Sequence, residues 1–236
     1  MNKLEWLIAF RYLGAQRKSL FVSLIGIFSL LGVSIGVFAL VVALAAVNGF
    51  EEEVTAQMIG KDAHVDVLSY DGEPFGAYEE LISEVKKADS TVVAVAPYLV
   101  YKMGISSRKV NDGVVIYGID PERSKQVVDI HQKIRWGHYS VDSLPDMGGT
   151  LRPGVILGIG LANRLRVVVG DKIVLQTFQS PDAMLASGGP KMMQAVVSGI
   201  FETGMYEYDA NLVYVGIPEM QKLLGIGDKV TGLQIR

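Results

Sequence analysis

The sequence contains one long stretch without a charged residue, and this stretch limits what the chain can fold into. No Asp, Glu, Lys or Arg occurs from Ser19 to Phe50, and Leu20–Val47 consists of Leu, Ile, Val, Phe, Ala, Gly and Ser alone. A helix needs about 20 such residues to cross the hydrocarbon core of a bilayer. The stretch therefore predicts a transmembrane helix near the N-terminus, and no later segment is apolar over a comparable length.

A cleaved secretory signal peptide is the competing interpretation of this stretch. Ala43, Leu44 and Ala45 resemble the small-residue cleavage site of such peptides. However, the apolar region of a signal peptide is only about 7–15 residues long, and this one is about twice as long. We therefore expect the helix to be retained as a membrane anchor.

The charges on either side of the helix predict its orientation. The acidic residues Glu51, Glu52 and Glu53 follow it, whereas Glu5 is the one acidic residue before it. Basic residues precede it at four positions: Lys3, Arg11, Arg17 and Lys18. Because positive charge is retained on the cytoplasmic side, we expect the N-terminus in the cytoplasm and the remainder in the periplasm or outside the cell.

The helix is expected to continue beyond the bilayer. Phe50, Val54 and Met58 extend an apolar stripe to Gly60, a plausible helix end. Leu20–Ile59 would be about 60 Å long at about 1.5 Å per residue, against a hydrocarbon core of about 30 Å. About half of the helix would then form a periplasmic stalk.

Three segments follow from this reasoning. Residues 1–18 mix apolar and charged side chains as in a cytoplasmic helix lying in the membrane interface, and the alternative is that they are the start of the span. Residues 19–59 form the transmembrane helix and stalk. Residues 60–236 form the periplasmic domain.

One face of the membrane helix is predicted to pack against another helix. Gly32 and Gly36 form a GxxxG pair, and small side chains let helix backbones approach closely in lipid. The alternative is that Gly and Ser are simply common in membrane helices. The small residues are spaced by three or four along this face: Ser29, Gly32, Gly36, Ala39 and Ala43.

The region after the helix predicts an α+β domain without internal repeats. Runs rich in β-branched and aromatic residues predict strands at His64–Leu68, Thr91–Ala96, Tyr98–Ile105, Val114–Ile119, Lys172–Phe178, Ala195–Phe201, Leu212–Val215 and Lys229–Ile235. Apolar residues at helical spacing predict helices at Ala77–Ala88, Gly160–Leu165 and Pro218–Leu224. Turn signals occur at Asp71-Gly72, Asn111–Gly113 and Gly148-Gly149.

Composition excludes several functions. The sequence has no cysteine, which rules out disulfides, thiol catalysis and Cys-ligated zinc within these residues. After residue 18 the chain has 18 basic and 24 acidic residues, so the domain should repel nucleic acid. A GxxxxGK[ST] phosphate loop is missing. We therefore expect no ATP hydrolysis by these residues, no cofactor and no nucleic-acid partner.

No residue pattern predicts a catalytic or metal site. Gly158-Ile159-Gly160 leads into a predicted helix, but Asn163 stands at the third position of a dinucleotide-binding fingerprint. His131 and His138 do not have the spacing of a known metal motif. We therefore assign no catalytic residue and no metal ligand.

The segment Gln179–Met192 reads as a long loop between two predicted strands. Loops of about 12–15 residues without secondary structure are uncommon and are often functional. Met184 and Leu185 are apolar residues in an otherwise loop-like composition, and such residues suit adaptable partner binding. Composition alone favours a mobile hairpin tip whose apolar side chains fold back on the sheet, with partner binding as the alternative.

Three stretches, in order along the whole chain, resemble a known family. Ile8–Val41, followed by Asn48–Glu51, resembles the first membrane helix of lipoprotein-releasing (Lol) permease subunits. Gly154–Leu175 resembles a segment in the periplasmic domains of these permeases and of their MacB and FtsX relatives, although Ile159 replaces the Lys that is common there. The resemblance implies a MacB-like periplasmic domain of mixed α/β structure.

The resemblance also implies a function. Such permeases are Type VII ABC transporter subunits of the bacterial inner membrane that act as dimers, with themselves or a paralogue, and are driven by a separate LolD-like cytoplasmic ATPase. They extract lipoproteins from the membrane lipid and pass them to a LolA-like periplasmic chaperone. Arg236 is where a second membrane helix would be expected, so the sequence resembles the N-terminal part of a permease.

The resemblance also implies binding roles for particular residues, which the residue patterns alone do not indicate. The lipoprotein acyl chains would contact Val42, Ala46 and Phe50. A protruding loop would bind the chaperone through Ser180, Pro181, Asp182, Ala183, Met184, Leu185 and Pro190.

Two alternatives to this assignment remain open. The first is a MacB- or FtsX-like permease that transmits ATPase cycles to efflux or to cell-wall hydrolases. The second is an unrelated single-pass adhesion or sensor module.

Overall fold

The computed structural model describes residues 4, 6–8, 11, 20–59, 63, 65–89, 91–108, 110–146, 148–178 and 189–236. In the first long helix, side chains are described for residues 24–49. The chain divides into two compact units, Met1–Gln57 and Met58–Arg236.

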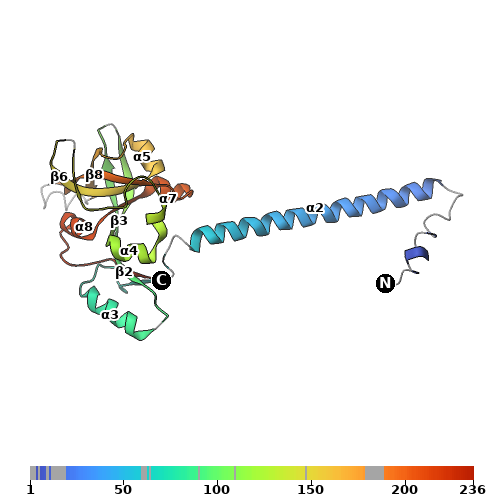
Figure 1. The fold of residues 1–236 in the computed structure, drawn as a ribbon, viewed down its shortest axis with the longest axis horizontal. Coiled ribbons are helices and arrows are strands. Elements are labelled where there is room, and N and C mark those ends of the chain that lie inside the picture. The colour runs from blue at the N-terminus through green and yellow to red at the C-terminus, as the bar shows by residue number, and fades with distance from the viewer. Residues whose placement is uncertain are drawn as a thin grey trace. The chain divides into compact units, whose positions relative to one another are not determined.

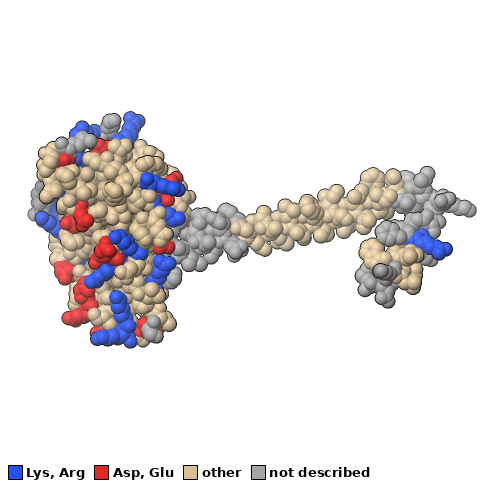
Figure 2. Space-filling view, in the orientation of Figure 1, with Lys and Arg blue, Asp and Glu red and all other residues tan. Residues whose placement is uncertain are grey.

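The first unit is dominated by helix α2, which covers Leu20–Ile59, the bounds that the sequence predicts. Its segment Leu24–Gly49 is long and apolar enough to cross a membrane, and none of that segment is buried within the structure. Figure 2 shows no charged side chain on the described surface of this helix. A helix that is apolar all round and unburied by protein suits a lipid environment.

The second unit is built on a mixed sheet, shown with its flanking helices in Figure 1. The strand order is β1-β10-β2-β3-β9-β6-β8-β4. Strands β5 and β7 lie off this path: β5 pairs with β6, and β7 pairs with β2 and β8. The strands are β1 (Val65–Leu68), β2 (Val95–Ser106), β3 (Asn111–Ile119), β4 (Ile134–Gly137), β5 (Ser143–Pro145), β6 (Leu151–Gly158), β7 (Lys172–Thr177), β8 (Met192–Phe201), β9 (Leu212–Gly216) and β10 (Gly232–Ile235).

Strand β7 closes part of this sheet into a ring. It pairs with β8 on one side and with the second half of β2 on the other. The pairs β3 with β9 and β6 with β8 are parallel, whereas the pairs β2 with β3 and β6 with β9 are antiparallel. Ring closure pairs edges that would otherwise be exposed. The first half of β2 leaves the ring and pairs with β10, which in turn pairs with β1.

Short helices accompany the strands. They are α3 (Tyr78–Ala88), α4 (Pro121–Val127), the 3₁₀ helix η1 (Asp129–Lys133), α5 (Ile159–Leu165), α7 (Tyr206–Asn211) and α8 (Ile217–Leu224). The start of α4 is set locally, because the Asp120 side chain accepts hydrogen bonds from the backbone of Glu122 and Arg123 and Pro121 fixes the first helical position. Gly225, at φ 72°, ends α8.

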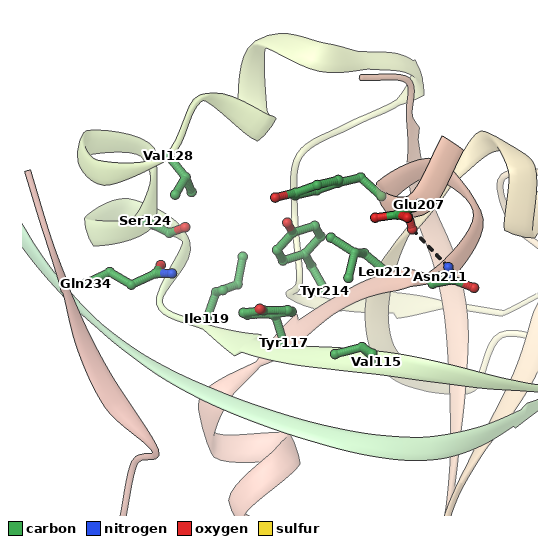
Figure 3. A pocket seen from close by; sticks show the side chains of 11 residues that line it. Val115, Tyr117, Ile119, Ser124, Val128, Glu207, Asn211, Leu212, Tyr214 and Gln234 are labelled. Carbon is green, nitrogen blue, oxygen red and sulfur yellow. Dashed lines mark hydrogen bonds between the residues drawn. The ribbon is translucent and has the colours of Figure 1, made fainter. Parts of the chain in front are cut away.

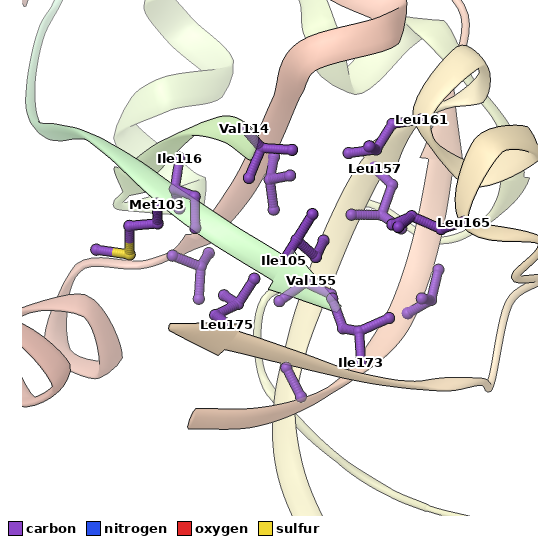
Figure 4. Packing of buried hydrophobic residues seen from close by; sticks show 14 of the residues in the cluster. Met103, Ile105, Val114, Ile116, Val155, Leu157, Leu161, Leu165, Ile173 and Leu175 are labelled. Carbon is purple, nitrogen blue, oxygen red and sulfur yellow. The ribbon is translucent and has the colours of Figure 1, made fainter. Parts of the chain in front are cut away.

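The main core lies inside the ring (Figure 4), where side chains from opposite strands meet. Ile105, Val155 and Leu175 come from three different strands and are fully buried. Leu161 from α5 and Met220 from α8 pack against the same cluster. Alternating residues of each ring strand therefore point inward, as the two-residue period of a strand requires.

Gly158, at the end of β6, permits a close approach of backbones. A Cβ atom at this position would lie 2.3 Å from the carbonyl oxygen of Asp209. The Asp209 carboxylate in turn accepts hydrogen bonds from the backbone nitrogens of Thr203 and Gly204 and from the Thr203 hydroxyl. Glycine therefore lets α7 lie directly against the end of β6.

Most predicted elements are confirmed, with small shifts at their ends. The strands β1, β3, β7, β8, β9 and β10 and the helices α3, α5 and α8 occupy predicted segments. His64, predicted as the first residue of β1, lies outside the described residues. The strands β4, β5 and β6 and the helices α4 and α7 were not predicted.

The predicted break at Pro97 is wrong, because β2 runs through it. Ala94 and Arg236 exchange both backbone hydrogen bonds. Backbone groups alternate in direction along a strand, so Pro97, three residues after Ala94, directs its backbone nitrogen away from β10. On that other side, pairing with β3 begins only at Tyr98. Pro97 therefore interrupts no ladder hydrogen bond, which is where proline is tolerated in a sheet.

The predicted turn at Asn111–Gly113 is also wrong. These residues start β3, and the turn lies just before them, where the Ser107 nitrogen donates to the Val110 oxygen at 2.9 Å. The Asp112 carboxylate accepts from Arg164 Nε at 2.9 Å. Asn111–Gly113 has the composition of a turn but is extended, and its Asp112 is held by a residue 52 positions away along the chain. By contrast, Gly72 and Gly149 lie at turns with positive φ, as predicted.

Candidate functional site

The predicted helix-packing face lies along the described part of α2. Ser29, Gly32, Gly36, Ala39 and Ala43 are all exposed there. A Cβ atom added at Gly32 or Gly36 would meet nothing within 4 Å. Within the described residues this face therefore has room for a closely approaching helix, and its packing role stays a prediction.

The residues expected at lipoprotein acyl chains lie on the same helix. Val42 and Ala46 are exposed and one helical turn apart, so they share a face. Phe50 is in α2 as well, but its side chain lies outside the described part. Nothing in the described structure tests their role.

The predicted chaperone-binding residues Ser180, Pro181, Asp182, Ala183, Met184 and Leu185 lie outside the described residues. Pro190 is described and exposed, and β8 begins at Met192. The structure therefore defines the two ends of the segment, at Phe178 and Gly189.

The base of the segment is held by three hydrogen bonds. The Thr177 nitrogen donates to the Lys191 oxygen at 3.0 Å, and the Lys191 nitrogen donates to Thr177 Oγ1 at 3.2 Å. Lys191 Nζ donates to the carbonyl oxygen of Leu224 at 2.9 Å, at the end of α8. The two ends are thereby joined to each other, and the Lys191 end is also fixed to α8.

The surface at this base is apolar and partly basic. Phe178 and Met192 are exposed at the two ends of the segment. A hollow of about 650 Å³ lies beside it, lined among others by Met193, Lys222 and Leu223. Exposed apolar side chains beside a hollow are typical of a protein-binding surface.

A groove on the outside of the ring, between α4 and α7, is shown in Figure 3. Tyr117 and Tyr214 lie on its floor with ring centroids 5.8 Å apart, and Glu207 is at its rim. Its volume of about 270 Å³ is below the roughly 300–1,000 Å³ of most small-molecule sites. The buried Ser124 Oγ faces the groove, close to Tyr139, without meeting hydrogen-bond geometry with any described residue.

The aromatic side chains of the groove continue into a stack that includes Tyr98. Burial raises the pKa of Tyr98, which stacks on Tyr117, to about 12, so this phenol stays protonated at neutral pH. Among the residues that the structure describes, no three His, Asp or Glu side chains converge as metal ligands. His131 lies beside the Tyr139 ring, with centroids 6.1 Å apart.

The most strongly paired charge in the described domain is Asp146. Its side chain is 1% exposed and lies 2.8 Å from Lys172 Nζ and 2.6 Å from Arg152 Nε. Hydrogen bonds from Lys172 and Arg152 hold the pKa of this carboxyl well below its usual range. The cluster joins the loop after β5 to β6 and β7 and is structural rather than catalytic.

Sequence reasoning missed the residues that shape these surfaces. Lys191 follows Pro190 in a polar segment, and no local pattern indicates its contact with Leu224, which is 33 residues away. Tyr214 and Tyr117 lie on parallel strands whose register only the fold defines. Strand alternation could have indicated that Tyr117 faces away from the core residue Ile116.

Comparison with known proteins identifies the family. The model of the MacB-like periplasmic core domain matches residues 27–236, which include most of α2 and the whole sheet. The chain belongs to this family. An apolar N-terminal helix followed by a mixed α/β domain of the MacB-like family confirms the predicted fold class.

Individual relatives carry names from lipoprotein transport. LolC of Xylella fastidiosa (strain Temecula1 / ATCC 700964), a lipoprotein-releasing system transmembrane protein, is 32% identical over 238 residues, covering 100% of this chain and 54% of that protein. LolC of Neisseria meningitidis serogroup B is 30% identical over 242 residues, covering 100% and 55%. The extracellular domain of the noncanonic ABC-type transporter YknZ from Gram-positive bacteria has a TM-score of 0.46 at 15% identity, covering 73% of this chain and 82% of that domain.

These similarities confirm the resemblance to Lol permease subunits from one end of the chain to the other. The chain spans about half the length of the curated relatives it matches.

Proposed function

We propose that this MacB-like chain is the N-terminal part of a permease subunit that releases lipoproteins from the bacterial inner membrane. The observation that carries the proposal is the similarity to LolC, which extends over 100% of the chain and includes both the membrane helix and the domain. A single-pass adhesion or sensor module would have no reason to share both parts with a transporter subunit.

The proposal assigns a place to each part of the chain. Residues 1–18 lie at the cytoplasmic surface, residues 19–59 cross the membrane and form the stalk, and residues 60–236 lie in the periplasm. The positive charge before α2 and Glu51–Glu53 after it support this orientation. These residues contain no phosphate loop, and we assign ATP hydrolysis to a separate LolD-like subunit on the similarity to Lol permeases.

Within the membrane, the small-residue face of α2 packs against another helix of the permease dimer. The open space at Gly32 and Gly36 supports a close backbone approach. The neighbouring face with Val42, Ala46 and Phe50 contacts the lipoprotein acyl chains. Exposed apolar side chains at Val42 and Ala46 are compatible with such a contact.

In the periplasm, the segment from Ser180 to Pro190 binds a LolA-like chaperone. Its described base supports this role in two ways. Phe178 and Met192 place exposed apolar surface at both ends, and Lys191 fixes the end that leads into β8. A fixed base reduces the conformational freedom that is lost when a partner docks.

The test is release of a lipoprotein by the complete transporter. The full-length permease and its cognate ATPase are reconstituted in proteoliposomes with a triacylated lipoprotein, and the soluble fraction is assayed for a complex of lipoprotein and chaperone. We expect the complex to form only when ATP and chaperone are both present. ATP hydrolysis without release would contradict the proposal and favour a MacB- or FtsX-like mechanical role.

A loop variant tests the chaperone step separately. Replacing Pro181–Pro190 with a Gly/Ser segment of equal length should leave the ring folded and abolish photocrosslinking of the chaperone to the permease. Undiminished crosslinking together with normal release would show that the segment is only a hairpin tip.

A further inference from the structure

A second apolar hollow lies on the opposite edge of the sheet from β1. Trp136 on β4 is 52% exposed, and Val168 and Val169, after α5, are 64% and 38% exposed. Together with Ile159 and Ile200 they line a hollow of about 430 Å³. Exposed Trp beside exposed aliphatic side chains is typical of the centre of a protein interface.

The hollow is preformed by the backbone. The Asp171 nitrogen donates to the Val168 oxygen at 3.0 Å, and Asp171 Oδ2 accepts from the Val168 nitrogen at 2.9 Å, which closes a tight turn around the two valines. Gly170 supplies the positive φ of 94° that this turn needs. A partner would therefore meet a surface that loses little conformational freedom on docking.

Glycine also brings Trp136 to the hollow. Gly137 has a φ of 75°, and a Cβ atom there would lie 2.2 Å from the Ser198 oxygen of β8. The end of β4 can approach β8 this closely only with glycine.

Positive charge flanks the hollow. A smaller hollow of about 220 Å³ shares Val167 with it and is lined by Arg108 and Arg166. Neither arginine forms an ion pair with any residue in the described part of the chain, whereas the nearby Lys172 is paired with Asp146. Asp171 also lines the smaller hollow, and its carboxylate accepts a hydrogen bond from the Val168 nitrogen. The surface is therefore apolar at its centre, and these two arginines make one side basic.

The complementary feature is a turn at the other edge of the domain. Tyr70 has a relative exposure of 108% and is followed by the exposed acids Asp71 and Glu73. This turn is also preformed, because the Gly72 nitrogen donates to the Ser69 oxygen at 3.1 Å and the Asp71 carboxylate accepts from the Ser69 hydroxyl. It presents one aromatic side chain followed by two negative charges.

One copy of the chain does not bring these two surfaces together. The turn follows β1 and the hollow includes β4, which are the two ends of the strand order. Through the ring that β7 closes, five strand spacings of about 4.8 Å separate the edges by about 24 Å along the sheet. No residue of the turn lines the hollow within one copy, so we take a contact between them to join two copies.

We propose that the Tyr70 turn of one copy docks into the Trp136 hollow of a second copy, with Asp71 and Glu73 beside Arg108 and Arg166. This inference rests on the permease dimer of the proposed function and names the surfaces that its periplasmic domains use. A concave hollow selects a projecting side chain rather than a flat lipid surface, and its basic side selects an acidic partner.

Engineered cysteines test the contact in the full-length permease in membranes. The 236 residues contain no cysteine, so a variant pair gives a clean signal once any cysteine in the rest of the protein is replaced. Two differently tagged copies are co-expressed, one with Tyr70→Cys and one with Val168→Cys, and oxidised. We expect a disulfide dimer carrying both tags. Val93→Cys, at a residue that is 78% exposed, replaces Val168→Cys in the matched control.

A charge exchange gives the second measurement. Arg166→Glu should lower the crosslink yield by about twofold to fivefold, as expected for an exposed ion pair. Asp71→Arg on the other copy should restore it. A yield equal to the Val93→Cys control, a crosslink only between two Tyr70→Cys copies, or a crosslink of Val168→Cys to the chaperone would overturn the proposal.

Lipoprotein release is measured on the same membranes with the wild-type permease. Absence of release would reject the proposed function while leaving the crosslink result intact, and normal release without the crosslink would reject only this contact.

Discussion

Lys191 Nζ lies 2.9 Å from the carbonyl oxygen of Leu224 and thereby ties the residue before β8 to the C-terminal end of α8. A cation at a helix C-terminus satisfies an unpaired carbonyl and is favoured by the helix dipole. The same residue exchanges hydrogen bonds with Thr177 across the base of the segment proposed to bind the chaperone. One side chain therefore couples the position of that segment to the core of the ring, which α8 joins through Met220 and Leu223.

Replacing Lys191 with Met is expected to loosen the base without unfolding the domain. Chaperone photocrosslinking from the segment should fall by about twofold to fivefold, because the lost hydrogen bond is solvent-exposed. Lys222→Met is the matched control, since Lys222 lines the same hollow and is also exposed. Equal losses in both variants would mean that positive charge alone matters at this surface.

Asp146→Asn is expected to destabilise the domain in a pH-dependent way. Because the carboxyl pKa is lowered in the folded state, its contribution is present above the unfolded pKa of about 3.9 and is lost as pH falls through the folded value. The variant should thus melt below the wild type at pH 7, and the difference should shrink on acidification below about pH 4. Thermal melting of the full-length protein in detergent measures it, with Glu84→Gln as an exposed control. A difference independent of pH would reject the ion-pair origin.

Gly158→Ala tests the contact between β6 and α7. The added Cβ would meet the Asp209 backbone oxygen at 2.3 Å, and neither backbone can move without disturbing the ring. We expect a loss of about 1–3 kcal/mol in the free energy of unfolding. Gly113→Ala serves as control, because a Cβ there meets nothing within 4 Å. Equal stability of the two variants, measured by denaturant unfolding, would contradict the close approach.

The fold was predictable where one residue pattern dominates locally. The uncharged stretch defines α2, and Ile82 and Val85 on one face of Tyr78–Ala88 define α3. Prediction failed where a distant contact decides. Pro97 reads as a break until the register of β2 is known, and β6 was missed because Pro153, Gly154 and Gly158 interrupt its apolar run.

The candidate sites were less predictable than the fold. The small residues spaced by three or four along α2 can be recognised directly from the sequence, because they lie in one continuous segment. The hollow at Trp136 instead combines residues from β4, α5 and β8 that only the sheet order brings together. The contact of Lys191 with Leu224 likewise depends on the packing of α8 against the ring.

The orientation of α2 can be tested with a reporter enzyme that is active only in the periplasm. Fused after Arg236, it should be active, because four basic residues precede the helix and three acidic residues follow it. Activity of a cytoplasmic reporter alone at the same site would reverse the assignment.

The small-residue face of α2 makes a prediction about assembly. Gly32→Leu and Gly36→Leu place a large side chain where a neighbouring helix backbone should approach, since open space is present at both positions. Both variants should insert into the membrane normally but lose the permease dimer and lipoprotein release. Val37→Leu, an exposed position outside the small-residue face, should retain both. Dimer recovery by affinity purification from cells that co-express two tagged copies measures the effect. Normal dimer yield and release in both glycine variants would show that this face contacts only lipid.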